Sequence, residues 1–168
     1  QFVELGTLIG EEDKAMAIAK GCKEQISRIS ALASSFGERP SVLIQIGANP
    51  LYVAGSDSFV NGFIVNAGAR NVLGEAKSGA YSKESIVKDS PDFIYIAAMG
   101  LLGEQERNEW MRLDSISAVK KKQIVVSEPS KICSPNPAEL PSTLLDIAIL
   151  FHPSHKEELA KLMPTPQN

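Results

Sequence analysis

The stretch from Leu43 to Leu73 constrains the fold of this chain more than any other part of the sequence. It reads LIQIGANPLYVAGSDSFVNGFIVNAGARNVL. Its first residues are apolar and rich in β-branched side chains, which favours a buried strand over Val42–Ile46. Gly47 and the pair Asn49-Pro50 then turn the chain, because proline cannot continue a hydrogen-bonded ladder. The sequence therefore predicts a strand that ends in a loop at one edge of a sheet.

A helix is predicted after this loop. Ser56 and Asp57 carry side-chain oxygens of the kind that accept hydrogen bonds from the free N–H groups of a starting helix. Apolar residues then recur at helical spacing: Phe59, Val60, Phe63, Ile64 and Ala67. Gly68 is suited to the left-handed conformation that ends a helix, and Asn71–Leu73 returns to the sheet. A strand, a loop, a helix and a second strand form the repeating unit of parallel α/β sheets.

A single long helix is predicted in front of this unit. Glu11, Glu12 and Asp13 place negative charge where a helix amino terminus favours it. Apolar residues then follow at steps of three or four: Ala15, Ile18, Cys22, Ile26, Ile29, Ala33 and Phe36. Over about 25 residues such a helix would be roughly 38 Å long. Gly37 closes it, and the apolar segment Phe2–Ile9 precedes it.

The remaining sequence continues the alternation of strands and helices. Strands are expected at Phe93–Ala97 and Ile124–Val126, and a helix capped by Ser82 is expected between the second and third strands. Further helices are expected at Glu104–Leu113 and from Leu140 to Ile149, with a loop over Glu128–Pro137. Four strands in this arrangement predict an α/β fold, a three-layer lobe whose mainly parallel central sheet is flanked by helices and preceded by the long helix.

Composition narrows the function classes. A chain of 168 residues with 43% apolar and 22% charged residues suits one soluble globular domain. Its net charge of −3 argues against a nucleic-acid partner and against a polybasic membrane patch. The two cysteines, Cys22 and Cys133, do not make a disulfide framework, and unpaired thiols are favoured over a bond between them. The first residue is Gln1, so we expect a processed or excised piece.

Nothing in the sequence favours catalysis. Phosphate-binding, dinucleotide-binding and nucleophile-elbow motifs do not occur in it. His152 and His155 are interpreted as exposed residues at a helix end, because no nearby acid or cysteine completes a metal site with them. Asp89 and Asp92 are interpreted as turn and cap residues. We therefore expect a protein that is not an enzyme, without intrinsic cofactor and without metal-ligating residues.

A binding surface is expected where the parallel strands end. Three stretches should meet there: Asn49–Ser56, Met99–Gly103 and Glu128–Pro135. Tyr52 and Tyr81 could contact a bulky ligand through their rings and phenolic oxygens, although Tyr52 could instead pack over the sheet edge. The polar candidates on the loops are Asn49, Lys131, Ser134 and Asn136. Cys133 is more typical of a small buried apolar residue than of a ligand to soft metal.

The motif G-x-N-P-x-Y-x-A-G-x-x-S-F-x-N-x-x-I-x-x-A-G-x-x-N, from Gly47 to Asn71, resembles the second lobe of a known family. The family is that of the class III (TroA-like) solute-binding proteins that feed ABC importers for iron-siderophores, haem and cobalamin. The likeness continues through Ser82–Ile86, Ser90–Ile94 and Phe151–Pro153, and so covers nearly the whole chain.

The resemblance implies a substrate-binding component of an ABC importer. Residues 1–38 would form an amino-terminal segment and the helix that joins two lobes, and residues 39–168 the carboxy-terminal ligand-binding lobe, with the first lobe absent. The Ser-x-Glu segment that carries the permease-docking acid in this family matches Ser82-Lys83-Glu84, so Glu84 is the expected docking residue. The location would be periplasmic or at the cell surface, with or without a lipid anchor on the full-length protein.

The ligand expected from the resemblance is a metal chelate, with an iron-siderophore ranked first, haem and cobalamin next, and molybdate-type oxyanions last. The loop Ser130–Pro135 departs from the arginine-bearing loop of many siderophore binders, because Lys131 is its only cation. A homodimer through the apolar segment Phe2–Ile9 is also expected. The alternative is a small α/β enzyme or chelatase-like domain whose catalytic groups come from a partner chain.

Overall fold

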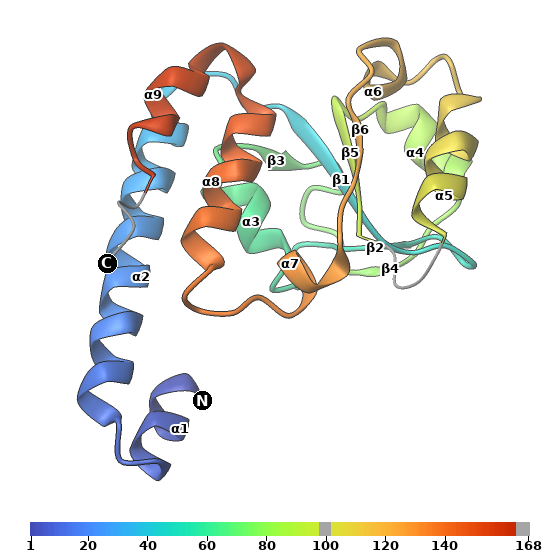
Figure 1. The fold of residues 1–168 in the computed structure, drawn as a ribbon. Helices are drawn as coiled ribbons and strands as arrows, with labels where there is room; N and C mark the ends of the chain where they lie inside the picture. Colours follow the sequence, from blue (N-terminus) through green and yellow to red (C-terminus); the bar gives the residue numbers. More distant parts are fainter. Residues whose placement is uncertain (98–101, 164–168) are drawn as a thin grey trace.

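The protein is described by a computed structural model that covers residues 1–97 and 102–163. One sheet lies at its centre (Figure 1). Its strands are β1 (Ser41–Gly47), β2 (Tyr52–Val53), β3 (Arg70–Asn71), β4 (Gly79–Ala80), β5 (Phe93–Ile96) and β6 (Ile124–Val126). The order is β4-β2-β1-β5-β6, and β3 pairs with β1. β1 runs parallel to β3 and β5, and β5 runs parallel to β6, so the predicted parallel core of the sheet is confirmed.

Two short strands were not predicted. β2 folds back antiparallel to β1, with Gln45 opposite Val53, and β4 then pairs antiparallel with β2. Both have only two residues, which is too short for an alternating pattern to be visible in the sequence. β3 pairs with the start of β1 at Ser41 and Val42, whereas β2 pairs with its end. The loop after β1 is therefore built into the sheet as a hairpin.

Helices cover both faces of the sheet. They are α1 (Phe2–Leu8), α2 (Glu12–Ser35), α3 (Asn61–Asn66), α4 (Lys83–Asp89), α5 (Gly103–Met111), α6 (Ser117–Lys120), α7 (Pro129–Cys133), α8 (Leu140–Phe151) and α9 (Lys156–Ala160), with a 3-10 turn at Pro153–His155. α2, α3, α8 and α9 lie on one face, and α4, α5 and α6 on the other (Figure 1).

The alternation of side chains along the strands produces two cores. Val42 and Ile44 of β1 pack toward α3 and α8, whereas Leu43 between them packs with Ile86 and Trp110 on the other face. Such alternation follows from the two-residue period of a strand. The three-layer α/β architecture predicted from the sequence is confirmed.

The long helix α2 has nearly the predicted bounds. Gly37 just beyond it has a φ of +76°, the left-handed conformation that favours glycine. Ile29 and Ala33 are buried against the lobe, because the carboxy-terminal half of α2 packs on α3 and α8. The amino-terminal half extends past the lobe, and α1 packs against it (Figure 1).

The apolar segment at the start of the chain is a helix, α1, that folds back on α2. Gly6 is buried in their crossing, and a side chain there would collide with the Cβ of Ala15. The two helices therefore approach closely. Leu5, Leu8 and Ile9 remain exposed on this hairpin.

The expected role of Ser56 and Asp57 as helix caps is wrong. The Ser56 hydroxyl donates to the carbonyl oxygen of Glu75 at 2.8 Å, and Asp57 Oδ1 accepts from the backbone N–H and the hydroxyl of Ser78, both at 2.7 Å. These side chains bind the loop before β4 instead of the helix. Helix α3 begins only at Asn61, so Phe59 precedes it and is 60% exposed.

The expected exposure of His152 is also wrong, because the ring is buried under the end of α2. Its Nε2 lies 2.9 Å from the carbonyl oxygen of Ala67, and its ring meets the Phe36 ring edge-on. His155 is half-buried and stacks on the Phe36 ring with 3.8 Å between ring centroids. Burial lowers the pKa of His152, because it disfavours the charged ring. A contact between distant segments decides this burial, and the local sequence does not encode it.

The predicted loop over Glu128–Pro137 contains a short helix, α7, that begins at Pro129, where proline suits the first helical turn. Both cysteines are free thiols, as the sequence favoured. Among the helices of the described residues, none is long and apolar enough to cross a membrane.

Candidate functional site

The carboxyl ends of β1, β5 and β6 meet at one edge of the sheet, the lower edge in Figure 1. The hairpin β1–β2 and the helix α7 lie there, and α2 extends past the same edge (Figure 1). Ligands of open parallel sheets bind at this edge. Of the expected stretch Met99–Gly103, residues 99–101 lie outside the described part of the chain.

Tyr52 and Asn49 lie on the hairpin at this edge, and both are exposed. Tyr52 is 41% exposed, whereas its neighbour Val53 is completely buried. The difference follows from strand alternation, which turns one side chain outward when the next turns into the core. The backbone of Tyr52 is fixed by pairing with Gly47 on one side and Ala80 on the other. The sheet thus presents an aromatic ring from a fixed position at the edge where the parallel strands end.

Tyr81 is held more tightly by its own loop. Its hydroxyl donates to the carbonyl oxygen of Lys77 at 2.7 Å, and its backbone N–H donates to Leu51 at 2.9 Å. Its ring is half-buried and packs against the core that contains Ile86 and Trp110. The hydroxyl is therefore already engaged, and the contact that Tyr81 would make with a ligand is through the ring.

Lys131, Ser134 and Asn136 are exposed on and after α7. Lys131 lines a hollow of about 390 Å³ between β6, α7 and α8, together with Tyr95 and Asp146. Asn136 Oδ1 accepts from the backbone N–H of Ala138 at 3.0 Å, so it shapes the turn before α8. These three residues come from the same segment, but Tyr52 and Tyr81 lie on the other side of the sheet edge, across β1 and β5.

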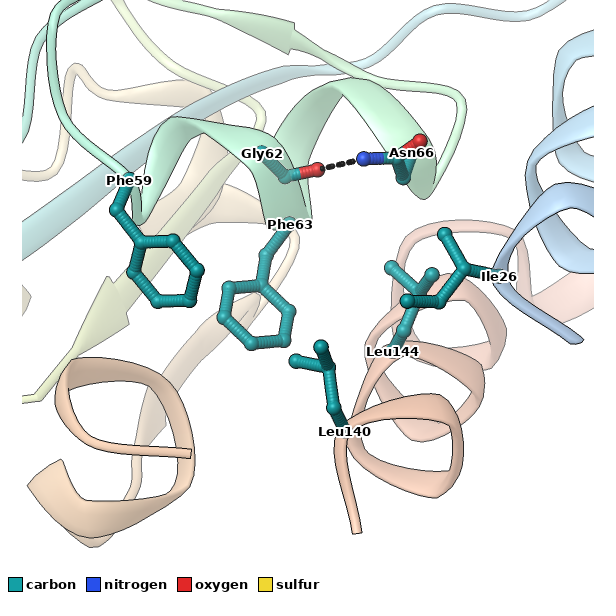
Figure 2. A pocket seen from close by; sticks show the side chains of 7 residues that line it. All are labelled: Ile26, Phe59, Gly62, Phe63, Asn66, Leu140 and Leu144. Atoms are coloured by element: carbon teal, nitrogen blue, oxygen red, sulfur yellow. Dashed lines mark hydrogen bonds between the residues drawn. The ribbon is translucent and has the colours of Figure 1, made fainter. Parts of the chain in front are cut away.

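An apolar hollow of about 280 Å³ lies between α2, α3 and α8 and was not predicted (Figure 2). Its lining is Ile26, Phe59, Gly62, Phe63, Asn66, Leu140 and Leu144. Phe59 and Phe63 meet edge-to-face with ring centroids 5.9 Å apart. Asn66 donates to the carbonyl oxygen of Gly62 at 2.8 Å, so its amide is engaged (Figure 2). The sequence signal was the pair of phenylalanines four residues apart, which we had read only as part of the apolar face of the predicted helix.

The described residues contain no cluster of side chains that could coordinate a metal ion. Within residues 1–97 and 102–163, no group of three or more His, Cys, Asp or Glu side chains could hold a metal ion. Cys133 is half-buried, and burial raises the pKa of its thiol, which keeps the thiol protonated near neutral pH.

Glu84 lies exposed in the first turn of α4. Ser82 caps this helix, as predicted, by accepting a hydrogen bond from the backbone N–H of Ser85 at 3.2 Å. Hydrogen bonds from its own backbone N–H and from the Ser82 side chain lower the pKa of Glu84. The carboxylate is thus ionised and open to a cationic partner.

A buried polar network beside this turn was missed by the sequence analysis. Gln45 is fully buried, and its side chain joins Glu106 and Trp110 of α5, while Lys83 of α4 forms an ion pair with Glu106. The only sequence signal was a glutamine inside an otherwise apolar strand.

Comparison with known proteins places the chain among solute-binding proteins. A profile of a family described as periplasmic binding protein matches residues 1–130. No curated protein matches the chain at a significant level.

Several solved structures share the fold. A periplasmic heme-binding protein from Pseudomonas aeruginosa is 25% identical, with a TM-score of 0.78 over 90% of this chain and 57% of its own. A possible iron-binding periplasmic solute-binding protein from Staphylococcus epidermidis is 24% identical, with a TM-score of 0.76 over 90% of this chain and 60% of its own. A protein of an ABC-type Fe3+-hydroxamate transport system from Saccharomonospora viridis is 18% identical, with a TM-score of 0.74 over 90% of this chain and 53% of its own.

The chain spans at most 60% of the length of these three structures, while nearly all of it is covered. The likeness therefore extends over the sheet and the long helix together. The family profile covers 130 of the 168 residues, including α2, the β1–β2 hairpin and Glu84. The chain belongs to the periplasmic binding protein family.

Proposed function

We propose that this chain is the carboxy-terminal, ligand-binding lobe of a substrate-binding component that delivers a metal chelate to an ABC importer. The observation that carries the proposal is the family match over residues 1–130. The solved relatives named above are described as heme-binding, iron-binding or part of Fe3+-hydroxamate transport, which favours a metal chelate as the class of ligand. The location consistent with the family is extracytoplasmic.

The side chains at this sheet edge suit a bulky chelate that carries its own metal-coordinating groups. Tyr52 offers an aromatic face of the kind that stacks on a planar or hydroxamate chelate, and Asn49 adds a polar group on the same hairpin. On the other side of the edge, Lys131 can meet negative charge, and Ser134 and Asn136 offer hydrogen-bonding groups. An iron-siderophore ranks first, and haem and cobalamin follow.

The titration of these ligands tests the proposal. The full-length protein would be titrated in turn with a ferric hydroxamate, haem and cobalamin, and tryptophan fluorescence would report binding. Tyr52→Ala is expected to lower the affinity for the chelate by about tenfold, equal to about 1.4 kcal/mol of binding free energy. Met111→Ala is a matched control, because Met111 on α5 is also 41% exposed. If none of the three compounds binds, or if both variants behave alike, the proposed site is wrong.

Glu84 is proposed to dock the permease of the importer. In the full-length protein, Glu84→Lys should leave folding and ligand affinity nearly unchanged, because an exposed substitution typically alters stability by under about 0.5 kcal/mol. Transport should be lost, since the charge that meets the permease is reversed. Asp89→Lys, at the other end of α4 and also exposed, is the matched control. Unimpaired uptake by the Glu84 variant would refute the docking role.

The present chain should bind such ligands weakly by itself. A two-lobed binder covers its ligand from both sides, and one lobe offers only part of the contacts. We expect a dissociation constant in the high micromolar range or weaker, because each lost 1.4 kcal/mol costs about a factor of ten. Submicromolar binding by the monomeric chain, measured by calorimetry, would contradict this half-site.

A further inference from the structure

We propose that the half-buried ion pair between Lys83 and Glu106 positions the turn of α4 that carries Glu84. The inference rests on the proposed docking role of Glu84 and assigns positioning residues to it. It starts from a buried acid, Glu106, which is only 7% exposed and which the proposed ligand site does not use.

The buried side of the network is anchored on β1. Gln45 Nε2 donates to Glu106 Oε2 at 2.9 Å and to the carbonyl oxygen of Gly47 at 3.0 Å. Gln45 Oε1 accepts from the indole N–H of Trp110 at 2.7 Å. Gln45 and Trp110 are both fully buried, so this part of the network is fixed by the core. The same glutamine side chain thus holds Glu106 and the end of the strand from which the β1–β2 hairpin begins.

The exposed side of the network is Lys83. Its Nζ lies 3.3 Å from Glu106 Oε2 and 5.3 Å from the centroid of the Trp110 ring, a distance at which a cation is attracted to the ring face. A buried carboxylate requires such a partner, because an unpaired charge in the interior is strongly unfavourable. Lys83 is therefore the cation that allows Glu106 to remain buried.

The position of Lys83 in its helix is otherwise unfavourable. It is the first residue of α4, and a helix amino terminus carries partial positive charge that disfavours a cation. Glu106 lies in the first turn of α5, where an acid is favoured. The lysine is thus not explained by the stability of its own helix. The contact with Glu106 accounts for its place.

This contact matters for Glu84 because α4 is only seven residues long. A helix so short is unstable alone, since its nucleation is unfavourable, and its first turn depends on tertiary contacts. On one side the turn is joined to the sheet through Tyr81, which donates to Leu51. On the other side it is joined through Lys83, the residue next to Glu84. The ion pair therefore sets where the Glu84 carboxylate lies relative to β1 and the ligand edge.

The test uses a double substitution that preserves the buried hydrogen bonds. Lys83→Met alone would leave Glu106 as an unpaired buried charge. Lys83→Met with Glu106→Gln removes both charges, keeps an apolar stem over Trp110 and keeps an oxygen that can accept from Gln45. The matched control is Glu109→Gln with Arg112→Met, which removes the exposed pair at the carboxyl end of α5, joined at 2.7 Å.

Two measurements are made on the full-length protein. Association with the membrane permease of the same transport system, in detergent, should weaken about three- to tenfold in the double variant and stay unchanged in the control. Hydrogen exchange at the Ser85 amide, which donates to the Ser82 cap, should be faster in the double variant than in the wild type. The midpoint of urea unfolding should be the same in both proteins. Lys83→Arg keeps the charge and should retain both wild-type values.

The outcomes separate this inference from the docking role. If Glu84→Lys does not impair association, the docking role of Glu84 fails. If Glu84→Lys abolishes association but the double variant associates like its control and its Ser85 amide exchanges normally, the positioning role fails while docking stands. Equal losses in Lys83→Arg and in the double variant would also overturn the positioning role, because the charge would then be irrelevant.

Discussion

Asp92 gives the sharpest stability prediction, because one carboxylate joins three elements of the lobe. Its Oδ2 accepts from the backbone N–H and the hydroxyl of Ser41, at 3.0 and 2.9 Å. Its Oδ1 accepts from the Ser117 hydroxyl and from Lys121 Nζ, both at 3.0 Å. Partial burial by itself would raise the pKa of Asp92, but the hydrogen bonds, led by that from the Ser41 backbone, lower it from 3.8 to about 2.

This lowered pKa sets the size of the effect of Asp92→Asn. One pKa unit corresponds to about 1.4 kcal/mol, so the shift corresponds to roughly 2 kcal/mol in favour of the folded, ionised state. The side chain is 30% exposed, and screening by solvent reduces the figure to about 1 to 2 kcal/mol. The asparagine also turns an N–H toward groups that donate. We expect Asp92→Asn to lower the free energy of unfolding by about 2 kcal/mol near neutral pH.

The dependence on pH identifies the cause. Because the folded pKa lies below the unfolded value of 3.8, the stabilisation is complete above that value and is lost as the pH falls through about 2. The assay is urea unfolding followed by circular dichroism between about pH 7 and pH 2.5, in which the gap between wild type and variant should narrow only below about pH 4. Asp89→Asn, three residues earlier and exposed, is the control. Parallel curves for wild type and Asp92→Asn over the whole range would refute the argument.

Three further predictions concern burial, backbone conformation and the exposed hairpin. Burial lowers the pKa of His152 below its usual value of 6.5, so the contribution of the neutral ring to the free energy of unfolding is complete above pH 6.5 and is lost as the pH falls below it. In urea unfolding, His152→Gln should therefore lose less stability than the wild type below about pH 6. Gly68→Ala should destabilise by about 2 kcal/mol or more, because Gly68 has a φ of +74° and a Cβ there meets the Ala33 carbonyl and His152, whereas Gly74→Ala, at a φ of +60° in open space, should cost only about 1 kcal/mol in the same assay. Sedimentation of the chain at increasing concentration should show self-association that Leu8→Lys abolishes, since Leu8 is 82% exposed on the α1–α2 hairpin, and a monomer at all concentrations would exclude it.

The sequence was most informative where a pattern is long or where a local contact decides. The stripe from Ala15 to Phe36 specified α2 because many turns repeat one period. Ser82 specified the start of α4 because the capping bond joins residues three apart in the chain. The exposure of Tyr52 also agrees with local reasoning, because it follows from alternation with buried Val53.

The sequence was least informative where distant segments compete for the same group. Ser56 and Asp57 have the chemistry of helix caps, but the loop at Glu75–Ser78 offers them donors and acceptors across the sheet edge. His152 follows a helix end, where solvent exposure is usual, yet α2 and the turn at Ala67 cover it. In both cases the hydrogen-bond partner lies far away in sequence, so it could not be identified from neighbours in the chain.

Gln45 shows how a departure from a pattern can itself be a signal. In the run Val42–Ile46 all residues except Gln45 are apolar, and a buried glutamine without hydrogen-bond partners would destabilise the strand. Its presence in β1 therefore required buried donors and acceptors nearby, and Trp110 and Glu106 supply them from α5. Glu106 in turn required a cation, which is Lys83 beside the proposed docking residue. Real proteins break a local rule where another requirement outweighs it, and here each polar group is accounted for by the next until the series of contacts ends at Lys83, the residue before Glu84.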